Sequence, residues 1–134
     1  MRPILAGAAL LLSACAHAPL EFDHEVTLTS GVTFDFKPVD ARERFSLDEQ
    51  RLYVHLRMFN AEQREQDFHV EVLDGRGDLV YTGGQVFTPN QRTWNVWAWH
   101  IIDPVTNAPG RWRILVYLDG DLIDTLRVRM LPAG

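Results

Sequence analysis

Apolar and polar residues alternate with a period of two along most of the chain. The longest such pattern runs from residue 109 to residue 131. Its apolar positions share one face: Trp112, Ile114, Val116, Leu118, Leu122, Leu126, Val128 and Met130. Alternation of this kind predicts two half-buried strands joined at Asp119-Gly120. We expect the apolar face to lie on a second sheet, with Trp112 buried between the two layers.

The connection between these two strands must preserve that face. A two-residue loop would pair the apolar Trp112 and Ile114 with the polar Arg127 and Thr125. A shift of one residue turns every side chain to the other face of a strand. The pattern therefore favours an odd-length loop with a β-bulge.

Shorter alternating segments precede this hairpin. They predict strands over residues 22–29, 32–36, 51–59, 67–73, 79–82, 85–88 and 92–102. Gly83-Gly84 is expected to break or bulge the chain between residues 79–82 and 85–88, which count as one strand if the chain only bulges there. Residues 39–50 are polar and predict a loop with one helical turn at most, anchored by Phe45 and Leu47.

Seven or eight short strands with turns between them and no convincing helix predict an all-β sandwich over residues 22–131. Several motifs occur in a fixed order: a Phe-rich strand, Leu52-Tyr53-Val54, a Val-x-Val strand with an Asp-Gly turn, an aromatic strand, then Pro-Gly-x-Trp and Asp-Gly. Over about residues 26–130 this order resembles a bacterial immunoglobulin-like layout. The resemblance implies an antiparallel immunoglobulin-like β-sandwich. It implies no catalytic or ligand-binding residue, because that layout serves unrelated functions.

The first residues of the chain have the arrangement of charged and apolar residues that is typical of an export signal. A positive Met1-Arg2 precedes an apolar run over residues 4–12 that is too short to span a bilayer. The following Leu12-Ser13-Ala14-Cys15 resembles the bacterial lipoprotein signal, which implies cleavage before Cys15 and acyl chains on its sulfur. Residues 1–14 would then be a signal peptide and residues 15–21 a lipidated tether.

Two further residues bear on the destination of the mature chain. Ala16 directly after the cysteine is consistent, within the lipoprotein family, with transport to the outer membrane rather than retention at the inner one. The alternative is cleavage after Ala16-His17-Ala18, which would release a soluble protein that begins at Pro19.

Composition excludes some classes of function. The formal net charge is −5, and no basic cluster is visible in the sequence. Nucleic-acid binding needs a basic face to neutralise phosphates, so no nucleic-acid partner is expected. The single cysteine excludes an internal disulfide.

Tryptophans provide the first candidate surface. Three of the four lie within residues 92–102, and Trp97 and Trp99 share one face of that strand. Aromatic residues on both faces indicate a central strand. Core filling is the favoured interpretation, because large aromatic side chains dominate small cores. The alternative is an exposed platform for sugar rings or a partner protein.

Arginines provide the second candidate surface. Arg111, Arg113, Arg127 and Arg129 are expected to project together from the side of the last hairpin that faces away from the core. The favoured interpretation is a solvated face on which Asp and Glu of a neighbouring strand separate these like charges. The alternative is a docking surface for an acidic partner or for phosphate-bearing envelope lipid.

No metal, cofactor or catalytic site is expected. His55 and His69 lie on successive strands and could be neighbours, but two histidines alone do not form a metal site. The Asp-Gly pairs at residues 74–75 and 119–120 are explained by turn chemistry. Arg76-Gly77-Asp78 is a tripeptide of some adhesion ligands, and it is too short to exclude chance. No serine has the context of a nucleophile, so enzymatic activity is not expected.

These observations lead to one functional expectation and one alternative. We expect a non-enzymatic cell-envelope lipoprotein, held at the outer membrane by acyl chains on Cys15, whose immunoglobulin-like domain binds or supports another envelope component, with a protein as the expected partner. The alternative is a carbohydrate-binding module that uses Trp97 and Trp99.

Overall fold

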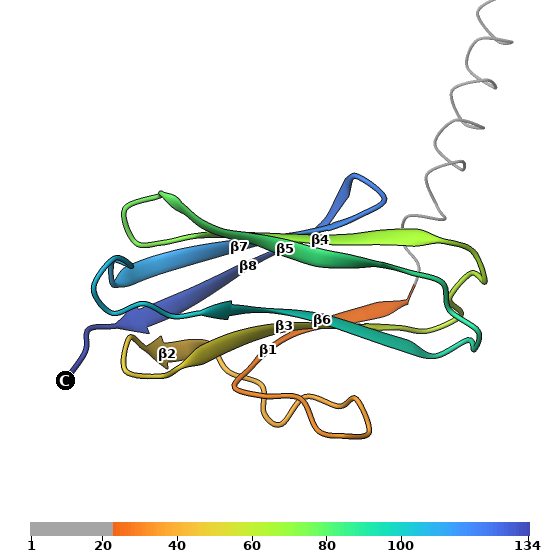
Figure 1. Cartoon of the computed structure of the whole chain (residues 1–134), viewed down its shortest axis with the longest axis horizontal. Coiled ribbons are helices and arrows are strands. Elements are labelled where there is room, and N and C mark those ends of the chain that lie inside the picture. The colour runs from red at the N-terminus through yellow and green to blue at the C-terminus, as the bar shows by residue number, and fades with distance from the viewer. Residues whose placement is uncertain (1–22) are drawn as a thin grey trace, which may run out of the picture.

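The computed structural model describes residues 23–134, which form a two-layered β-sandwich (Figure 1). Eight strands and no helix occur in this part of the chain: β1 (His24–Thr29), β2 (Arg44–Ser46), β3 (Arg51–Met58), β4 (Gln66–Leu73), β5 (Leu79–Phe87), β6 (Trp94–Ile101), β7 (Gly110–Leu118) and β8 (Asp121–Leu131). Residues 23–134 thus contain no helix that is long and apolar enough to cross a membrane. The expected signal peptide and Cys15 lie outside the described residues.

The two sheets are unequal. One has three antiparallel strands in the order β1-β3-β6, and the other has five in the order β2-β8-β7-β4-β5. The short strand β2 runs parallel to the end of β8, so the sandwich is not wholly antiparallel. β6 lies at an edge of its sheet, which corrects the expectation that it is central.

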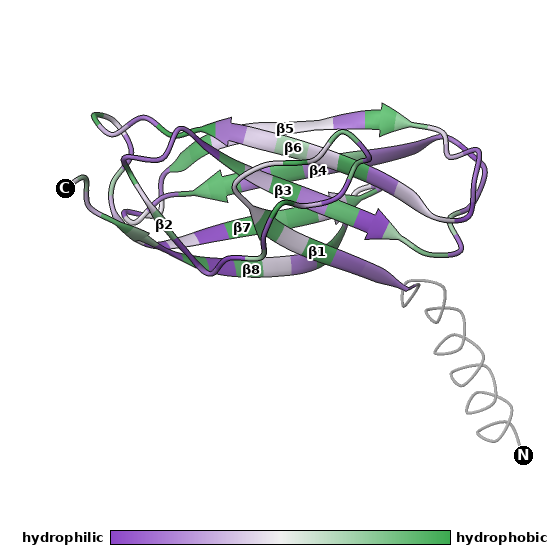
Figure 2. Ribbon diagram, turned by 90° about the horizontal axis from the view of Figure 1, so that it is seen from below, coloured by the Kyte–Doolittle hydropathy of each residue, from purple (hydrophilic) through white to green (hydrophobic). Residues whose placement is uncertain are grey.

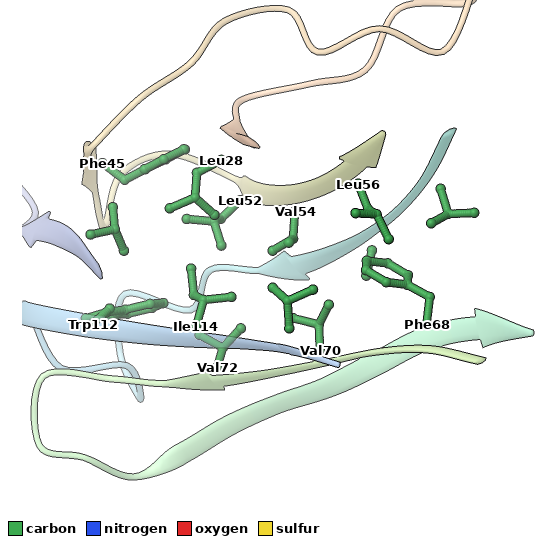
Figure 3. Close-up of a cluster of buried hydrophobic side chains, with 14 of the residues drawn as sticks. Leu28, Phe45, Leu52, Val54, Leu56, Phe68, Val70, Val72, Trp112 and Ile114 are labelled. Atoms are coloured by element: carbon green, nitrogen blue, oxygen red, sulfur yellow. The ribbon is translucent and has the colours of Figure 1, made fainter. Parts of the chain in front are cut away.

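The core lies between the sheets and follows the period-two pattern. Trp112 has 0% of its surface exposed, as expected. Apolar side chains from both sheets point toward one another in this layer, among them Leu52, Val54 and Leu56 from β3 and Val70 from β4 (Figure 3). Figure 2 shows the corresponding change between hydrophobic and hydrophilic residues along the strands. Each buried side chain of this size stabilises the fold by about 1.5–3 kcal/mol.

In the last hairpin, the register is adjusted within strand β8 and not in the loop. Asp119 and Gly120 form a two-residue turn, and both have positive φ. The bulge lies in β8, where the pairing shifts across Ile123 and Leu122 turns outward, so that Trp112 meets Val128. The predicted bulge is therefore present, but the odd-length loop and the inward placement of Leu122 are wrong. A type I′-like turn matches the strand twist, and the bulge then restores the apolar face.

Residues 32–36 do not form the expected strand. Only an isolated bridge joins Val32 to Pro38, and the chain turns tightly between them. The N–H of Phe36 donates to the carbonyl of Thr33, and Phe36 has a φ of 68°. Local hydrogen bonding of this kind competes successfully with an alternating pattern over so few residues.

Two further differences concern strand boundaries. The segment expected to be a loop contains β2, whose Phe45 is buried as predicted, and Leu47 is buried just after it. β5 is continuous and in register through Gly83-Gly84, where a break or bulge was expected. A Cβ at Gly84 would lie 1.8 Å from the carbonyl oxygen of Phe68, so this glycine permits close approach of two strands.

Candidate binding surfaces

Trp97 and Trp99 lie on the outer face of the three-stranded sheet. Trp97 pairs with His55 of β3, and Trp99 pairs with Tyr53. The inward positions of β6 are the alternate ones, such as Val96, which is buried. Trp99 is 43% exposed and Trp97 is half-buried, so core filling is the wrong interpretation for both.

The segment over residues 31–43 folds across part of this face. The ring of Phe36 stacks on Trp97, with 5.5 Å between ring centres. The carbonyl oxygen of Phe36 lies 2.8 Å from Nε2 of His55. Since a carbonyl only accepts, Nε2 carries the proton of a neutral ring. Burial lowers the pKa of His55, which is consistent with that neutral form.

A partly buried hydrogen-bond network fixes this segment. Asp40 accepts from the hydroxyl of Thr29 at 2.8 Å and from the N–H of Ser30 at 2.9 Å. Although partial burial acts in the opposite direction, these hydrogen bonds hold the pKa of Asp40 below its usual value. Phe36 is therefore held over the sheet by a charged anchor at the base of the segment.

An open groove runs along β6 beside these rings, and we call it the aromatic groove. Its volume is about 630 Å³, and no charged side chain lines it. The lining includes ring faces and uncharged amides: Phe36, Asn90, Gln91, Asn95, Trp97 and Trp99. Rings next to amide groups suit a neutral ligand that has both apolar faces and hydrogen-bonding groups.

The groove contains one unsatisfied polar atom. The Oδ1 of Asn95 is buried and has no hydrogen-bond partner among residues 23–134. The Nε of Arg57, in the cross-strand partner of Asn95, is likewise buried and unpaired in this part of the chain. A buried acceptor without a donor costs free energy, and a rotation of the Asn95 amide toward the groove would let a ligand donate to it.

The five-stranded sheet carries a contrasting surface on its outer face. The four expected arginines are all exposed, with Arg111 opposite Arg129 and Arg113 opposite Arg127. Arg44 of β2 lies beside Arg129 and extends the group. We call this group the arginine cluster: Arg44, Arg111, Arg113, Arg127 and Arg129.

The arginine cluster lacks close ion pairs within the described chain, although the exposed Glu43 borders it. None of its side chains makes an ion pair or a hydrogen bond with any residue of the described chain. Glu71 on the neighbouring β4 instead contacts His69 and the hydroxyl of Tyr117, each at 3.4 Å. The ion pairs with Asp and Glu of a neighbouring strand that the favoured interpretation implies are therefore absent from residues 23–134.

Arg44, Phe36 and Asn95 were not identified from the sequence. The polar composition of residues 39–50 hides Arg44, although Arg44-Phe45-Ser46-Leu47 alternates with a period of two. Phe36 lies in a turn rather than in the strand that its alternation with Phe34 predicts. Asn95 shares the outward face of Trp97, but nothing local distinguishes it as an unpaired acceptor.

The remaining sequence candidates have structural partners. His55 and His69 lie in different sheets, so they are not neighbours. Asp74 is buried and accepts from the N–H of Arg76 and the N–H of Ala108, each at 2.9 Å. These bonds hold the pKa of Asp74 below its usual value despite burial.

Asp74 thereby ties the β4–β5 turn to the connection before β7. Arg76, the first residue of the Arg-Gly-Asp tripeptide, is tied to the same connection through the carbonyl of Thr106 at 3.0 Å.

A second buried polar pair closes the same end of the sandwich. The Nε2 of His100 donates to Oδ1 of Asn107 over 2.8 Å, and burial lowers the pKa of His100. The indole of Trp112 donates to the carbonyl of Ala108 at 2.6 Å. No group of three or more His, Cys, Asp or Glu side chains placed to hold a metal ion occurs within residues 23–134.

Comparison with solved structures defines the fold class. An immunoglobulin-like protein from Pseudomonas aeruginosa superposes with a TM-score of 0.51 at 11% identity, over 81% of this chain and 94% of that protein. The domain has an immunoglobulin-like fold.

Part of a larger enzyme has a similar fold. A β-glucosidase from Listeria innocua matches with a TM-score of 0.51 at 13% identity, over 84% of this chain but only 17% of the enzyme. At these identities the likeness concerns the fold alone. No protein-family model matches the chain, and no curated protein matches it either.

Proposed function

We propose that this chain is a lipid-anchored, non-enzymatic protein of the bacterial cell envelope, and that its immunoglobulin-like domain binds another envelope component through the aromatic groove. The carrying observation is the groove itself. It combines exposed ring faces with an unpaired buried acceptor on an otherwise charged and acidic chain. Exposed apolar ring surface favours association with a partner, and the amides beside it can hydrogen-bond to that partner.

Binding explains this site better than catalysis does. Proton transfer needs a titratable group within reach of a substrate. No charged side chain lines the groove. His55, whose ring stacks on Trp97, is 1% exposed and is already bonded to the carbonyl of Phe36. A ligand in the groove therefore meets rings and amides and no available acid or base.

The proposed anchor is Cys15, supported by the Leu12-Ser13-Ala14-Cys15 motif. Cys15→Ala should abolish acylation and release the protein from the membrane fraction, because several acyl chains anchor a protein stably. Fractionation and intact mass of the mature protein are the measurements. An unmodified wild-type chain whose variant stays in the membrane would contradict the anchor.

A carbohydrate-binding module is the second candidate function. Its specific support is the uncharged lining, in which Asn90, Gln91 and Asn95 flank the rings of Trp97 and Trp99. Sugar rings present apolar faces that stack on aromatic rings, and their hydroxyl groups can hydrogen-bond to the exposed amides of Asn90 and Gln91. A neutral glycan of the envelope would then be the bound component.

Site-specific photocrosslinking in cells tests the groove and separates these partners. A photoreactive residue at Gln91, on the groove, should form an adduct that disappears when Trp99→Ala is introduced. The matched control is the same residue at Phe34, which is 96% exposed and does not line the groove. Mass analysis then distinguishes a protein from a glycan. Equal adducts at both positions, or none at Gln91, would contradict the proposal.

A further inference from the structure

The arginine cluster is compact. Arg44, Arg129 and Arg111 form one row across the adjacent strands β2, β8 and β7. Arg127 and Arg113 form the next row. Neighbouring strands lie about 4.8 Å apart, and alternate residues of one strand lie about 6.8 Å apart. The five arginine side chains therefore project from a small area of one sheet face.

Nothing in the fold explains why these charges are gathered. Like charges directly opposite one another on neighbouring strands destabilise a sheet. No acidic side chain within residues 23–134 forms an ion pair with any of the five. A shallow hollow of about 380 Å³ lies over them, lined by Arg44, Arg111, Arg127 and Arg129 together with Val128 and the exposed Glu43. The arrangement is thus costly to the domain and open to an anion.

We propose that the arginine cluster is a binding site for closely spaced phosphoryl groups. Each phosphoryl group offers up to three acceptor oxygens and as much as two negative charges, so one group can engage two or three neighbouring guanidiniums. Arginine presents a planar fork that matches such oxygens in pairs. A carboxylate carries only one negative charge, and each carboxylate of a peptide is on a separate side chain. An acidic peptide therefore has a lower density of negative charge than adjacent phosphoryl groups.

This site is separate from the proposed function of the aromatic groove. The cluster lies on the outer face of the five-stranded sheet, near the C-terminal end of β8, whereas the groove follows β6 of the other sheet (Figure 1). β1, the first strand of the domain, begins at the opposite end of the sandwich from the cluster, so the cluster is also remote from the N-terminal end of the domain (Figure 1). The two sites can therefore succeed or fail independently.

The test is calorimetric titration of the full chain in nonionic detergent and phosphate-free buffer. One arm uses inorganic tripolyphosphate, and the other uses micelles doped with phosphatidic acid. We expect binding that weakens as salt rises, because screening shortens the reach of exposed charges. Arg127→Glu with Arg129→Glu should lower the affinity about tenfold or more, since hydrogen bonds to charged groups are worth at least that factor.

A matched double variant, Lys37→Glu with Arg51→Glu, changes the net charge equally at exposed positions outside the cluster. It should leave the affinity within about twofold, because distant surface charges are largely screened. An equal loss in both double variants would overturn the site, as would the absence of binding in both arms at low salt.

Two further comparisons complete the design. Binding in only one arm supports the phosphoryl site and identifies its source as free or lipid-borne. Hexaglutamate that binds as tightly as tripolyphosphate would overturn the phosphoryl assignment in favour of an acidic peptide. Both double variants carry substitutions at exposed positions, and their melting temperatures check that the fold is intact.

Discussion

The outer faces of the two sheets share one core but differ in chemistry. On the three-stranded sheet, rings lie against one another and against the segment over residues 31–43, and no charged group lines the groove. On the five-stranded sheet, five arginines project side by side without acidic partners in the described chain. On the first face, side chains contact one another within the domain. On the second face, like charges lie next to one another, which is electrostatically unfavourable for the domain.

This contrast separates what folding requires from what binding requires. Folding fixes the inward positions, such as Trp112 and Val70, and leaves outward positions free. Outward positions that folding does not determine tend to carry polar residues, with rings and like charges spread over the surface. A cluster of exposed rings or of like charges therefore needs an explanation other than folding. We infer two ligands of opposite character, one neutral and one anionic.

The largest expected effect separates core tryptophan from groove tryptophan. Trp112→Ala should lower the free energy of unfolding by about 3–5 kcal/mol, because it leaves a cavity and removes the hydrogen bond from the indole to the carbonyl of Ala108. Trp99→Ala should cost about 1 kcal/mol or less, which is typical of a partly exposed site. Chemical denaturation measures both. Similar losses in the two variants would mean that Trp99 belongs to the core.

Acidification should lower the free energy of unfolding of the domain, because His55 and His100 are buried in their neutral forms. Burial lowers the pKa of His55 and of His100 below the ordinary value of 6.5. Below pH 6.5 the unfolded chain therefore binds protons more readily than the folded one. Stability is fully present above pH 6.5 and is lost as the pH falls through the folded pKa values.

Denaturation at a series of pH values measures this loss. His55→Gln keeps an N–H that can donate to Phe36 and removes one titration, so its stability should depend less on pH. A profile as steep as that of the wild type would contradict the buried, neutral His55. Asp40 and Asp74, whose pKa values lie below 3.8, contribute a separate loss at still lower pH.

The smallest expected effect has the opposite sign. Arg129→Glu places an acidic side chain between Arg111 and Arg44, so it should stabilise the domain by about 0.2–1 kcal/mol in phosphate-free buffer. Arg51→Glu, whose cross-strand partner is Ile101, should change stability by about 0.5 kcal/mol at most. Destabilisation by Arg129→Glu would show that the cluster is already neutralised within the domain.

The sequence allowed the layered fold to be predicted because burial repeats with a fixed period. Trp112 and Leu52 could be assigned to the core from alternation alone, and both are buried. The faces of β6 could not be assigned, because Trp94 and Trp97 make both faces aromatic. Only the pairing with β3 determines that Trp97 faces outward.

The candidate sites depended on contacts that local patterns do not encode. The pairs Arg111–Arg113 and Arg127–Arg129 were visible, but Arg44 joined them only through the parallel pairing of β2 with β8. Phe36 reaches Trp97 because a turn, rather than a strand, brings it there. Both contacts join residues far apart in the sequence.

The claim that the two faces bind separately can be tested in one titration. Tripolyphosphate is added to the full chain in nonionic detergent while the arginine Nε–H and tryptophan indole N–H resonances are followed by NMR. We predict that resonances of Arg111, Arg127 and Arg129 shift and saturate, while those of Trp97 and Trp99 stay in place. Shifts at Trp97 and Trp99 without shifts at the arginines would contradict the account.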